Sequence, residues 1–468
     1  MTTTQEAIAS PTQDYGSASA GGPDPTRFDV KEAWYPVAYV VDLDKDSPTR
    51  FTLLEQGIVI WWDLKGDTWR VFEDKCPHRL APLSEGRVNE EGLLECPYHG
   101  WAFSGSGSCE HIPQASEELQ ANLSNRACAV SIPTSVQQGL LFVYPGRAEN
   151  ASRVTVPIIQ ALEDEPDGWV VLNTFRDLPY DALTLLENVL DASHIPYTHH
   201  ETVGNRKNAA PMEMEVTEAS KQGFQGIWPE GPRKGKLGTQ HTTFVAPSLM
   251  HHDLTSKQFG RTMTVVYAVP TRKGECRLFA RFPFKFSSKL PSFFIKRTPR
   301  WWSHISNNGV LEDDQIFLHI QERELEKDRE KSYAQACYLP TQADRYVLQF
   351  RKWVSDYKAD PFPGRSLSRE WSKDALLDRY NSHTKHCGSC APALRRIQAA
   401  RKGAILVSAL SWSAIPITTT LGGLNFLSAS LLTGVSLSAV ALWFWLSNLE
   451  RKFYDGRELP PRNVVRKR

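Results

Sequence analysis

The chain has 468 residues, of which 41% are hydrophobic and 23% are charged, and its net charge is +1. This length is sufficient for about two or three domains, and the near-zero charge gives no indication of a nucleic-acid partner. The 8 cysteines are too few for a disulfide scaffold in a chain of this size. Cysteine pairs with motif spacing therefore indicate metal or redox chemistry.

Residues 1–27 are rich in Thr, Ser, Ala, Gly and Pro and contain no apolar run of the kind found in a secretory signal. Their only base is Arg27, which is unlike an Arg-rich transit peptide. We predict a short disordered tail. The same features predict a protein that is made and kept on the cytosolic side, as in a bacterium.

Short strand-like runs separated by turns extend from residue 28 to about residue 150, for example 58–62 and 68–72. Two boxes follow these runs. Cys76-Pro-His78 and Cys96-Pro-Tyr-His99 each provide one thiol and one imidazole. The four side chains match the ligand set of a Rieske [2Fe–2S] centre, in which two Cys hold one iron and two His the other.

A Cys2His2 zinc site is the alternative for these boxes, but a zinc finger usually takes both Cys from one box and both His from the other. Respiratory Rieske proteins carry an additional cysteine in each box, where this chain has Ala81 and Tyr98. The boxes therefore predict a cluster of the ferredoxin and oxygenase branch. A cluster alone makes an electron carrier, whereas a cluster with a second iron makes an oxygenase.

Residues 181–191 have helical spacing and lead into a second possible metal site. His194 and His199 are five positions apart, and Asp191 precedes the first by three; chance histidines at a polar helix end are the alternative. Pro196 interrupts the regular turn between the histidines and allows both rings to face one ion. Oxygenases of this type hold iron with two His and one carboxylate, so we predict His194 and His199 as iron ligands.

Residues 235–290 have the composition of a sheet, most clearly at 262–269 and 276–286. Residues 310–322 are predicted to form one helix that buries the apolar positions 311, 316–318 and 320. Three acids, Glu312 to Asp314, would stand at its start, where the helix dipole favours negative charge. We predict Asp314 as the third iron ligand, with Asp313 as the alternative, and a supporting role for His319.

A Cys-x-x-Cys pair, Cys387 and Cys390, follows at the end of an Arg- and Trp-rich region. It is typical of a redox-active dithiol. It could also bind a metal with His383 or His386, or it could be an inert pair in a reducing compartment.

No charged residue occurs between Lys402 and Glu450. Since a membrane-spanning helix needs about 20 apolar residues, we predict two such helices, 404–421 and 424–449, with a turn at Gly422-Gly423. Basic residues on both outer flanks predict a hairpin with both ends on the cytosolic side. A buried pair of helices in a soluble core is the alternative.

Four segments of this sequence together resemble the pheophorbide a oxygenase group, over roughly residues 30–455. This group is similar to the chloroplast inner-envelope Rieske proteins and, more distantly, to chlorophyllide a oxygenase, which lacks the late Cys-x-x-Cys. The segments are Cys76–Arg87, Cys96–Trp101, Gly107–Cys109 with Ile112–Gln114, and Glu187–His200.

The resemblance implies a membrane-anchored oxygenase that takes single electrons from ferredoxin and uses a [2Fe–2S] cluster and mononuclear Fe(II) to oxygenate a chlorophyll-derived tetrapyrrole. Such oxygenases usually form homotrimers, in which the cluster of one subunit feeds the iron of the next. Asp191 would then connect a cluster histidine to an iron histidine, and Asn188 would line the iron pocket. The sequence has no flavin or nicotinamide fingerprint, so the reductase is expected to be a separate protein.

The expected fold is α+β: an all-β Rieske domain, an antiparallel-sheet and helix catalytic domain of helix-grip type, and a transmembrane hairpin. Two other functions stay open, a membrane redox sensor or electron-transfer protein and an oxygenase of an unrelated aromatic compound. The predicted divisions of the chain are a tail (1–27), the Rieske domain (28–150), the catalytic domain (155–380), a Cys-x-x-Cys linker (381–402), two spans (403–449) and a basic tail (450–468).

Overall fold

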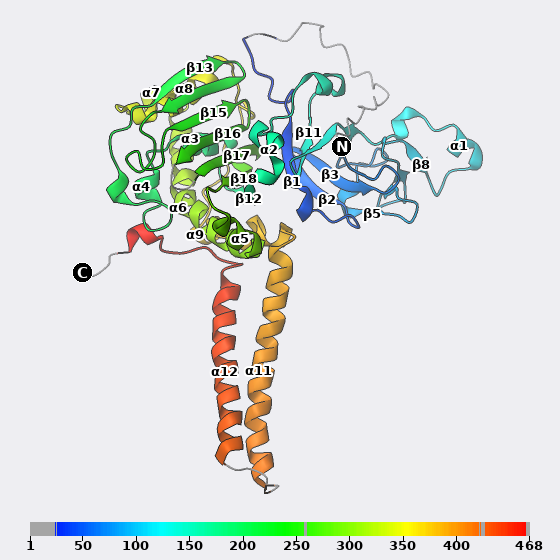
Figure 1. Cartoon of the computed structure of the whole chain (residues 1–468). Helices are drawn as coiled ribbons and strands as arrows, with labels where there is room; N and C mark the ends of the chain where they lie inside the picture. The colour runs from blue at the N-terminus through cyan, green and yellow to red at the C-terminus, as the bar shows by residue number, and fades with distance from the viewer. Residues whose placement is uncertain (1–23, 25, 257–259, 421, 423–425, 465–468) are drawn as a thin grey trace. The chain divides into compact units, whose positions relative to one another are not determined.

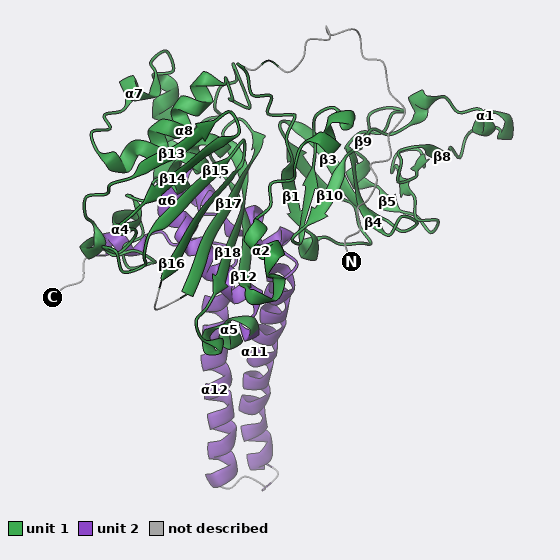
Figure 2. Ribbon diagram, turned by 45° about the horizontal axis from the view of Figure 1, so that its top comes forward, with its two compact units in different colours: residues 1–296, 317–370 green, residues 297–316, 371–468 purple. Residues whose placement is uncertain are grey.

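The computed structural model describes residue 24 and residues 26–256, 260–420, 422 and 426–464 (Figure 1). The predicted tail lies almost entirely outside these residues. The chain divides into two compact units, which are coloured separately in Figure 2. Unit 1 comprises residues 1–296 and 317–370, and unit 2 comprises residues 297–316 and 371–468. The predicted domain limits stay a prediction.

The N-terminal part of unit 1 contains three antiparallel sheets, with strand orders β2-β3-β4-β9, β5-β6-β7-β8 and β1-β11-β10. β3 and β4 confirm the strands predicted at 58–62 and 68–72. The strands are β1 (Tyr35–Tyr39), β2 (Thr49–Leu53), β3 (Gln56–Asp63), β4 (Thr68–Glu73), β5 (Arg87–Val88), β6 (Leu94–Glu95), β7 (Ala102–Phe103), β8 (Cys109–His111), β9 (Ser131–Ile132), β10 (Thr134–Gln137) and β11 (Leu140–Val143).

The hydrophobic core of this region extends to the cysteines of the two boxes. Val59, Trp61 and Phe72 belong to the same buried cluster as Cys76 and Cys96. β3 and β4 place these large side chains on a common face because alternate residues of a strand point the same way. The cysteines are therefore held by close packing against the sheet, while the loops that carry them reach outward.

The second part of unit 1 is a seven-stranded antiparallel sheet with the order β12-β18-β17-β16-β15-β14-β13. Helix α3 contacts β16, β17 and β18, and it also contacts α8. The sheet confirms the strands predicted at 262–269 and 276–286, and its combination with helices confirms the α+β class. Its strands are β12 (Val170–Leu178), β13 (Glu215–Ser220), β14 (Gly223–Trp228), β15 (Gln240–Val245), β16 (Leu249–Ser256), β17 (Gly260–Arg272) and β18 (Glu275–Lys285).

Apart from α8 and the part of α6 (Arg300–Lys327) that belongs to unit 1, the helices of this unit have 9 residues or fewer. α3 is amphipathic: Leu185, Leu186 and Leu190 are buried, and the helix contacts the central strands of the sheet through such a face. The helices are α1 (Glu117–Ala121), α2 (Gln160–Asp164), α3 (Ala182–Leu190), α4 (Ile195–Thr198), α5 (Lys289–Arg297), α7 (Tyr333–Ala336) and α8 (Arg345–Asp356).

Helix α6 (Arg300–Lys327) is 28 residues long and crosses the boundary between the units at residue 316. It begins at Arg300, so the prediction that Glu312 to Asp314 stand at a helix start is wrong. The predicted apolar buried face is also wrong in part, because Ile320 is exposed. Polar side chains occupy the buried face instead. These buried polar residues are His304, Asn308, Glu312, Asp313, Asp314, Gln315, His319 and Glu322.

Unit 2 contains two long helices that lie side by side (Figure 1). α11 (Cys390–Thr420) has 31 residues and α12 (Phe426–Arg451) has 26, and both are long and apolar enough to cross a membrane. Small side chains are buried between them, and the hydroxyls of Ser408 and Ser436 lie 2.8 Å apart. Small and hydroxylated residues at a contact are typical of helices that pair in lipid.

The two helices agree with the predicted spans, although α11 begins earlier, at Cys390, and continues through Pro416. Of the predicted turn, Gly422 is described, with a φ of 69° that suits glycine, whereas Gly423 lies outside the described residues. The remaining helices of unit 2 are α9 (Lys373–Leu376), α10 (Arg379–Ser382) and the 3₁₀ helices η8 (Thr384–His386) and η9 (Pro461–Asn463).

Candidate metal centres

The two Cys/His boxes fold into loops with the same hydrogen-bond pattern. The backbone N–H of Cys76 donates to Ala81 (2.8 Å), and that of Leu80 donates to Cys76 (2.9 Å). In the second loop, Cys96 donates to Trp101 (2.7 Å) and Gly100 donates to Cys96 (3.1 Å). Each cysteine therefore closes its own turn at both its N–H and its carbonyl. The two thiols therefore stand at equivalent positions of their loops, and the imidazole follows two residues later in the first loop and three residues later in the second.

The four box side chains divide into a buried pair and an outer pair. Cys76 and Cys96 are 1% and 2% exposed, whereas the imidazole rings of His78 and His99 lie nearer the surface, with centroids 4.6 Å apart. His78 also stacks on Trp101, at 4.6 Å. Two inner sulfurs and two outer imidazoles fit a [2Fe–2S] cluster whose His-bound iron faces outward.

The environment of Cys76 also fits an iron–sulfur ligand. Burial raises the pKa of its thiol to about 12 in the absence of a metal, while the backbone N–H groups of His78 and Arg79 act in the opposite direction. N–H groups directed at a sulfur stabilise the thiolate that iron requires, and they tune the potential of such clusters. The donor set, the burial and the N–H···S contacts all suit the predicted cluster.

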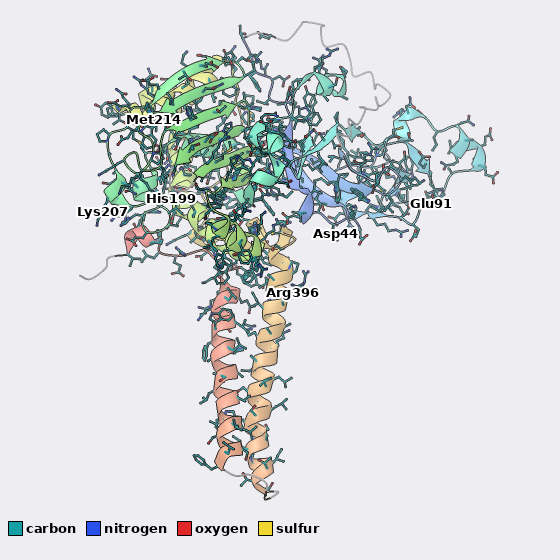
Figure 3. All side chains as sticks on the ribbon, in the orientation of Figure 1. Asp44, Glu91, His199, Lys207, Met214 and Arg396 are labelled. Carbon is teal, nitrogen blue, oxygen red and sulfur yellow. The ribbon has the colours of Figure 1, made fainter. Side chains whose placement is uncertain are left out.

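The predicted iron histidines flank a single turn of helix, α4. His194 stands immediately before α4 and His199 immediately after it, and their Nε2 atoms are 3.2 Å apart. Pro196 lies in the first turn, where a missing N–H removes no helical hydrogen bond. It therefore helps to start the turn rather than to break a longer helix. His199, labelled in Figure 3, is 5% exposed.

Asp191 orients the first of these histidines. Its backbone carbonyl contacts Nδ1 of His194 at a short distance, which leaves Nε2 available for a metal. Its side-chain Oδ1 accepts hydrogen bonds from the backbone N–H of Ser193 (2.7 Å) and from the Ser193 hydroxyl (2.5 Å), and Oδ2 is 3.9 Å from His194 Nδ1. Asn188, whose carbonyl accepts from the Asp191 N–H at 3.2 Å, lies one turn earlier.

Asp314, the predicted third ligand, is carried by unit 2, whereas both histidines belong to unit 1. The assignment of Asp314 to the iron site therefore stays a prediction. Asp314 is 5% exposed and stands one turn before the part of α6 that belongs to unit 1. The neighbouring Asp313 instead has its Oδ1 3.9 Å from the Arg462 guanidinium. Two imidazoles and one carboxylate are the ligands typical of a non-haem Fe(II) site.

Two buried acids, Glu187 on α3 and Glu322 on α6, fix the position of α3 through hydrogen bonds. Helix α3 directly precedes Asp191. Glu187 accepts hydrogen bonds from the Tyr333 hydroxyl (2.6 Å) and from Arg351 Nε (2.5 Å). Glu322 on α6 accepts from the Asp181 N–H (2.8 Å) and from the Thr184 hydroxyl (2.9 Å). Burial and the nearby Asp181 raise the pKa of Glu322 to about 8. His319, predicted to have a supporting role, contacts the Pro179 carbonyl at 2.5 Å.

His252 on β16 is a further contributor, which the sequence analysis missed. Its Nε2 lies 2.9 Å from the Val189 carbonyl, and its Nδ1 lies 2.8 Å from the Thr242 hydroxyl and 3.0 Å from Gln240 Nε2. Desolvation lowers its pKa to about 4. A neutral ring with an Nε2–H satisfies all three contacts and holds the end of α3. Only its place on a sheet strand, opposite α3, identifies it.

Two histidines lie close to the Cys-x-x-Cys pair. Cys387, Cys390, His383 and His304 form a second group whose ligand atoms all lie within 4.8 Å of one another. His383 was one of two histidines that the sequence offered as a partner, and the other, His386, is exposed. His304 was missed because it lies far away in the sequence, on α6.

Two family models match the chain. A model described as Rieske [2Fe-2S] domain matches residues 33–134, and one described as Pheophorbide a oxygenase matches residues 244–332. The first covers both Cys/His boxes, and the second covers Asp314. The predicted iron–sulfur domain is thereby confirmed.

Curated relatives are similar over most of the chain. Pheophorbide a oxygenase of Arabidopsis thaliana is 37% identical, with 86% of this chain and 81% of the relative covered. Flavonoid 8-hydroxylase 2 of Ocimum basilicum is 34% identical, covering 81% and 76%. Protein TIC 55 of Arabidopsis thaliana is 30% identical, covering 83% and 79%.

Solved structures share the fold of much of the chain. Dicamba monooxygenase bound to dicamba has a TM-score of 0.57 at 21% identity and covers 71% of this chain and 98% of its own. NdmA of Pseudomonas putida CBB5 with caffeine has a TM-score of 0.56 at 20% identity and covers 73% and 98%. At these identities the likeness shows the fold alone.

Proposed function

Because the chain belongs to the pheophorbide a oxygenase family of Rieske-type oxygenases, we propose that it oxygenates a chlorophyll-derived tetrapyrrole at a mononuclear iron. The observation that carries this proposal is the presence of two different sets of metal-ligating side chains in one chain: the Cys/His boxes, and the pair of His194 and His199, for which Asp314 is the proposed third ligand. An electron carrier needs only the first set. The second set provides the open coordination positions that dioxygen chemistry requires.

The positions of the side chains in the two sets support the following ligands. Cys76, Cys96, His78 and His99 hold the [2Fe–2S] cluster, and His194, His199 and Asp314 hold Fe(II). Iron bound in this way supplies the activation of dioxygen. The contribution of the chain is to orient the ligands: the Asp191 carbonyl occupies Nδ1 of His194, so Nε2 is the nitrogen that faces the metal.

Electrons come from a ferredoxin, with a separate reductase behind it, and they enter at the cluster. The active form is a homotrimer in which the cluster of one subunit serves the iron of its neighbour. The exposed position of His78 supports this arrangement, since an outward-facing ligand can contact a second protein. Asp191, whose Oδ2 lies 3.9 Å from His194, connects the two metal ligands across that contact, and Asn188 lines the iron pocket.

Helices α11 and α12 anchor the enzyme in a membrane as a two-span hairpin. Large apolar side chains are exposed along both helices, among them Leu410, Trp412 and Trp445, and lipid would cover them. Basic residues flank the outer ends of both helices and retain both ends on the cytosolic side. They are Arg395, Arg396, Arg401 and Lys402 in the first half of α11, with Arg451 at the end of α12 and Lys452 directly after it. An apolar pigment would reach the site from that membrane.

A flavonoid is the second candidate substrate, because a relative named flavonoid 8-hydroxylase is 34% identical. Both substrate classes are flat and aromatic, so the choice needs an assay. The full chain in detergent, with ferredoxin, its reductase and isotopically labelled dioxygen, is incubated with pheophorbide a, chlorophyllide a or a flavone. Label in a tetrapyrrole, detected by mass spectrometry, supports the proposal, and label only in the flavone replaces it.

A redox sensor without turnover is the remaining alternative. Metal analysis separates it from an oxygenase, since a sensor contains the two cluster irons and no mononuclear iron. A purified chain with cluster iron alone, and with no label in any substrate, would overturn the oxygenase proposal. The Asp314→Ala variant provides the matched preparation in which only cluster iron is expected.

A further inference from the structure

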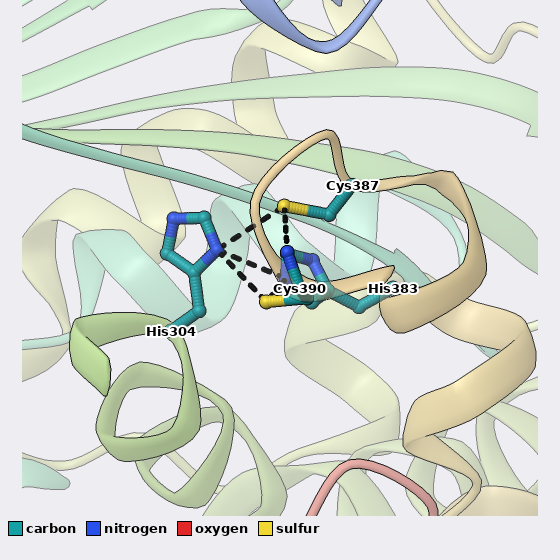
Figure 4. Close-up of side chains that lie close together, drawn as sticks. All are labelled: His304, His383, Cys387 and Cys390. Carbon is teal, nitrogen blue, oxygen red and sulfur yellow. Dashed lines mark hydrogen bonds between the residues drawn. The ribbon is translucent and has the colours of Figure 1, made fainter. Parts of the chain in front are cut away.

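Four buried metal-ligating side chains that the proposed oxygenase chemistry does not use meet in unit 2 (Figure 4). His304 comes from α6, His383 follows α10, and Cys387 and Cys390 flank the entry to α11. We call them the hairpin-base cluster. Each is at most 1% exposed. Such a concentration of thiols and imidazoles in a closed interior needs a chemical reason, since buried polar groups are costly unless they are satisfied.

The distances within the hairpin-base cluster suit one central ion. His383 Nε2 lies 3.1 Å from His304 Nδ1 and 3.3 Å from Cys390 Sγ. His304 Nδ1 lies 3.4 Å from each of the two sulfurs. A tetrahedral zinc site with ordinary Zn–N and Zn–S bonds has edges of about 3.3–3.8 Å. The observed separations are similar to these edge lengths or slightly shorter. They are too short for an iron–sulfur cluster, because the ligands of such a cluster are distributed over two or more irons.

The charges of a zinc site also fit this interior. Two thiolates and two neutral imidazoles balance the two positive charges of Zn²⁺, so the filled site is neutral and can be fully buried. The backbone N–H groups of Ser389 and Cys390 lie 3.4 and 3.5 Å from Cys387 Sγ. N–H groups directed at a sulfur stabilise its thiolate form.

A redox dithiol fits these surroundings less well. Reactive cysteines are partly exposed so that an oxidant or a partner thiol can reach them, whereas both of these sulfurs are closed off. Neither of the two cysteines forms a disulfide in the structure. Each also has an imidazole nitrogen within 3.4 Å, which a dithiol does not require.

We propose that His304, His383, Cys387 and Cys390 hold a structural Zn²⁺ ion that fastens α6 to the base of the membrane hairpin. With four protein ligands the site has no open position, and closed zinc sites are structural rather than catalytic. A buried ion pair reinforces the same junction: the Arg379 guanidinium contacts Glu312 of α6 at 2.6 and 2.7 Å. The metal therefore stabilises the helix that also carries Asp314.

The test is metal analysis of the full-length chain, purified in detergent without added metal. We expect one zinc per chain in addition to iron, and X-ray absorption at the zinc edge should give two sulfur and two nitrogen neighbours at about 2.3 and 2.0–2.1 Å. Cys390→Ser and His304→Ala should each lower zinc at least about 10-fold. His386→Ala is the matched control, because His386 belongs to the same short segment but is exposed, and it should retain zinc.

The visible spectrum of the Rieske cluster, whose ligands lie in unit 1, reports whether unit 1 of each variant is folded. If a variant does not fold, X-ray absorption at the zinc edge of the wild-type protein tests the proposed zinc site without the variants. Wild-type protein that contains cluster iron but no zinc, zinc with only oxygen and nitrogen neighbours, or a Cys387–Cys390 disulfide in a non-reduced digest would each overturn the proposal. None of these results depends on which substrate the oxygenase accepts.

Discussion

The Nε2 atoms of His194 and His199 lie 3.2 Å apart, although five positions separate the two residues in the sequence. The single turn of α4 brings them together, and the carbonyl of Asp191 selects the nitrogen of His194 that faces outward. Helix α3 leads directly into this pair, and it is held by Glu322 of α6 and by His252 of β16.

Asp314 should be required for mononuclear iron, and Asp313 should not. In Asp314→Ala the site keeps two imidazoles but loses its only carboxylate, so we expect the mononuclear iron to be lost and turnover to fall at least about 100-fold. Cluster iron should be unchanged, as measured by metal analysis and the Rieske spectrum. Asp313→Asn is the control, and iron loss there with normal iron in Asp314→Ala would assign the ligand to Asp313.

Asp191→Asn should slow turnover without emptying either centre. The substitution retains the backbone carbonyl that orients His194 but removes the negative charge 3.9 Å from its Nδ1, so turnover should fall about 10–100-fold. Ser193→Ala, which removes one hydrogen-bond donor and leaves the carboxylate, should have a much smaller effect. Stopped-flow reduction of the cluster, followed by its reoxidation in oxygen, measures the step. Normal reoxidation in Asp191→Asn would contradict the assigned role.

His252 should give a pH dependence of stability on the acid side. Its pKa is lowered from 6.5 to about 4 in the folded chain, so the folded state disfavours its protonation. The stabilisation is complete above pH 6.5 and is lost as the pH falls towards about 4, by roughly 1–3 kcal/mol in the free energy of unfolding. Denaturant unfolding of His252→Asn should lack this slope. His241→Asn, on the exposed side of the neighbouring strand, should retain it.

Glu322 should give the opposite dependence at higher pH. Its pKa is raised from 4.5 to about 8, so folding favours the protonated acid, and stability falls as the pH rises from about 4.5 to about 8. Glu322→Gln keeps an oxygen that can accept from Asp181 and Thr184 and should flatten this slope. It should be about 1–2 kcal/mol more stable than the wild type above pH 8. Glu324→Gln, an exposed acid on the same helix, is the control and should leave the slope unchanged.

Much of this protein can be predicted from short stretches of the sequence. The cluster boxes, the His194/His199 pair and the two apolar helices are recognisable because each depends on spacing or on an uninterrupted run. The strands at β3, β4, β17 and β18 are recognisable for the same reason, since alternation and composition are local properties.

Other features depend on which residues burial brings together, and the sequence does not contain that information in readable form. The start of α6 was misjudged because a helix with a polar buried face lacks the apolar stripe that marks an ordinary helix. His252 could not be identified because strand pairing, not spacing, places it opposite α3. The choice of Asp314 over Asp313 stays a prediction, because the sequence does not show which way α6 turns each carboxylate. The structure places Asp313 Oδ1 3.9 Å from the Arg462 guanidinium.

The Cys-x-x-Cys motif shows what can be learned from the sequence and what can be learned only from the tertiary structure. The sequence by itself determined that two thiols stand close together at the entry to the membrane helices. Only the tertiary structure added His304 from α6, a distant segment, and showed all four groups to be buried. The physical reason is that the ligands of a metal site surround one point. Residues from distant parts of the sequence reach such a point only when the chain folds.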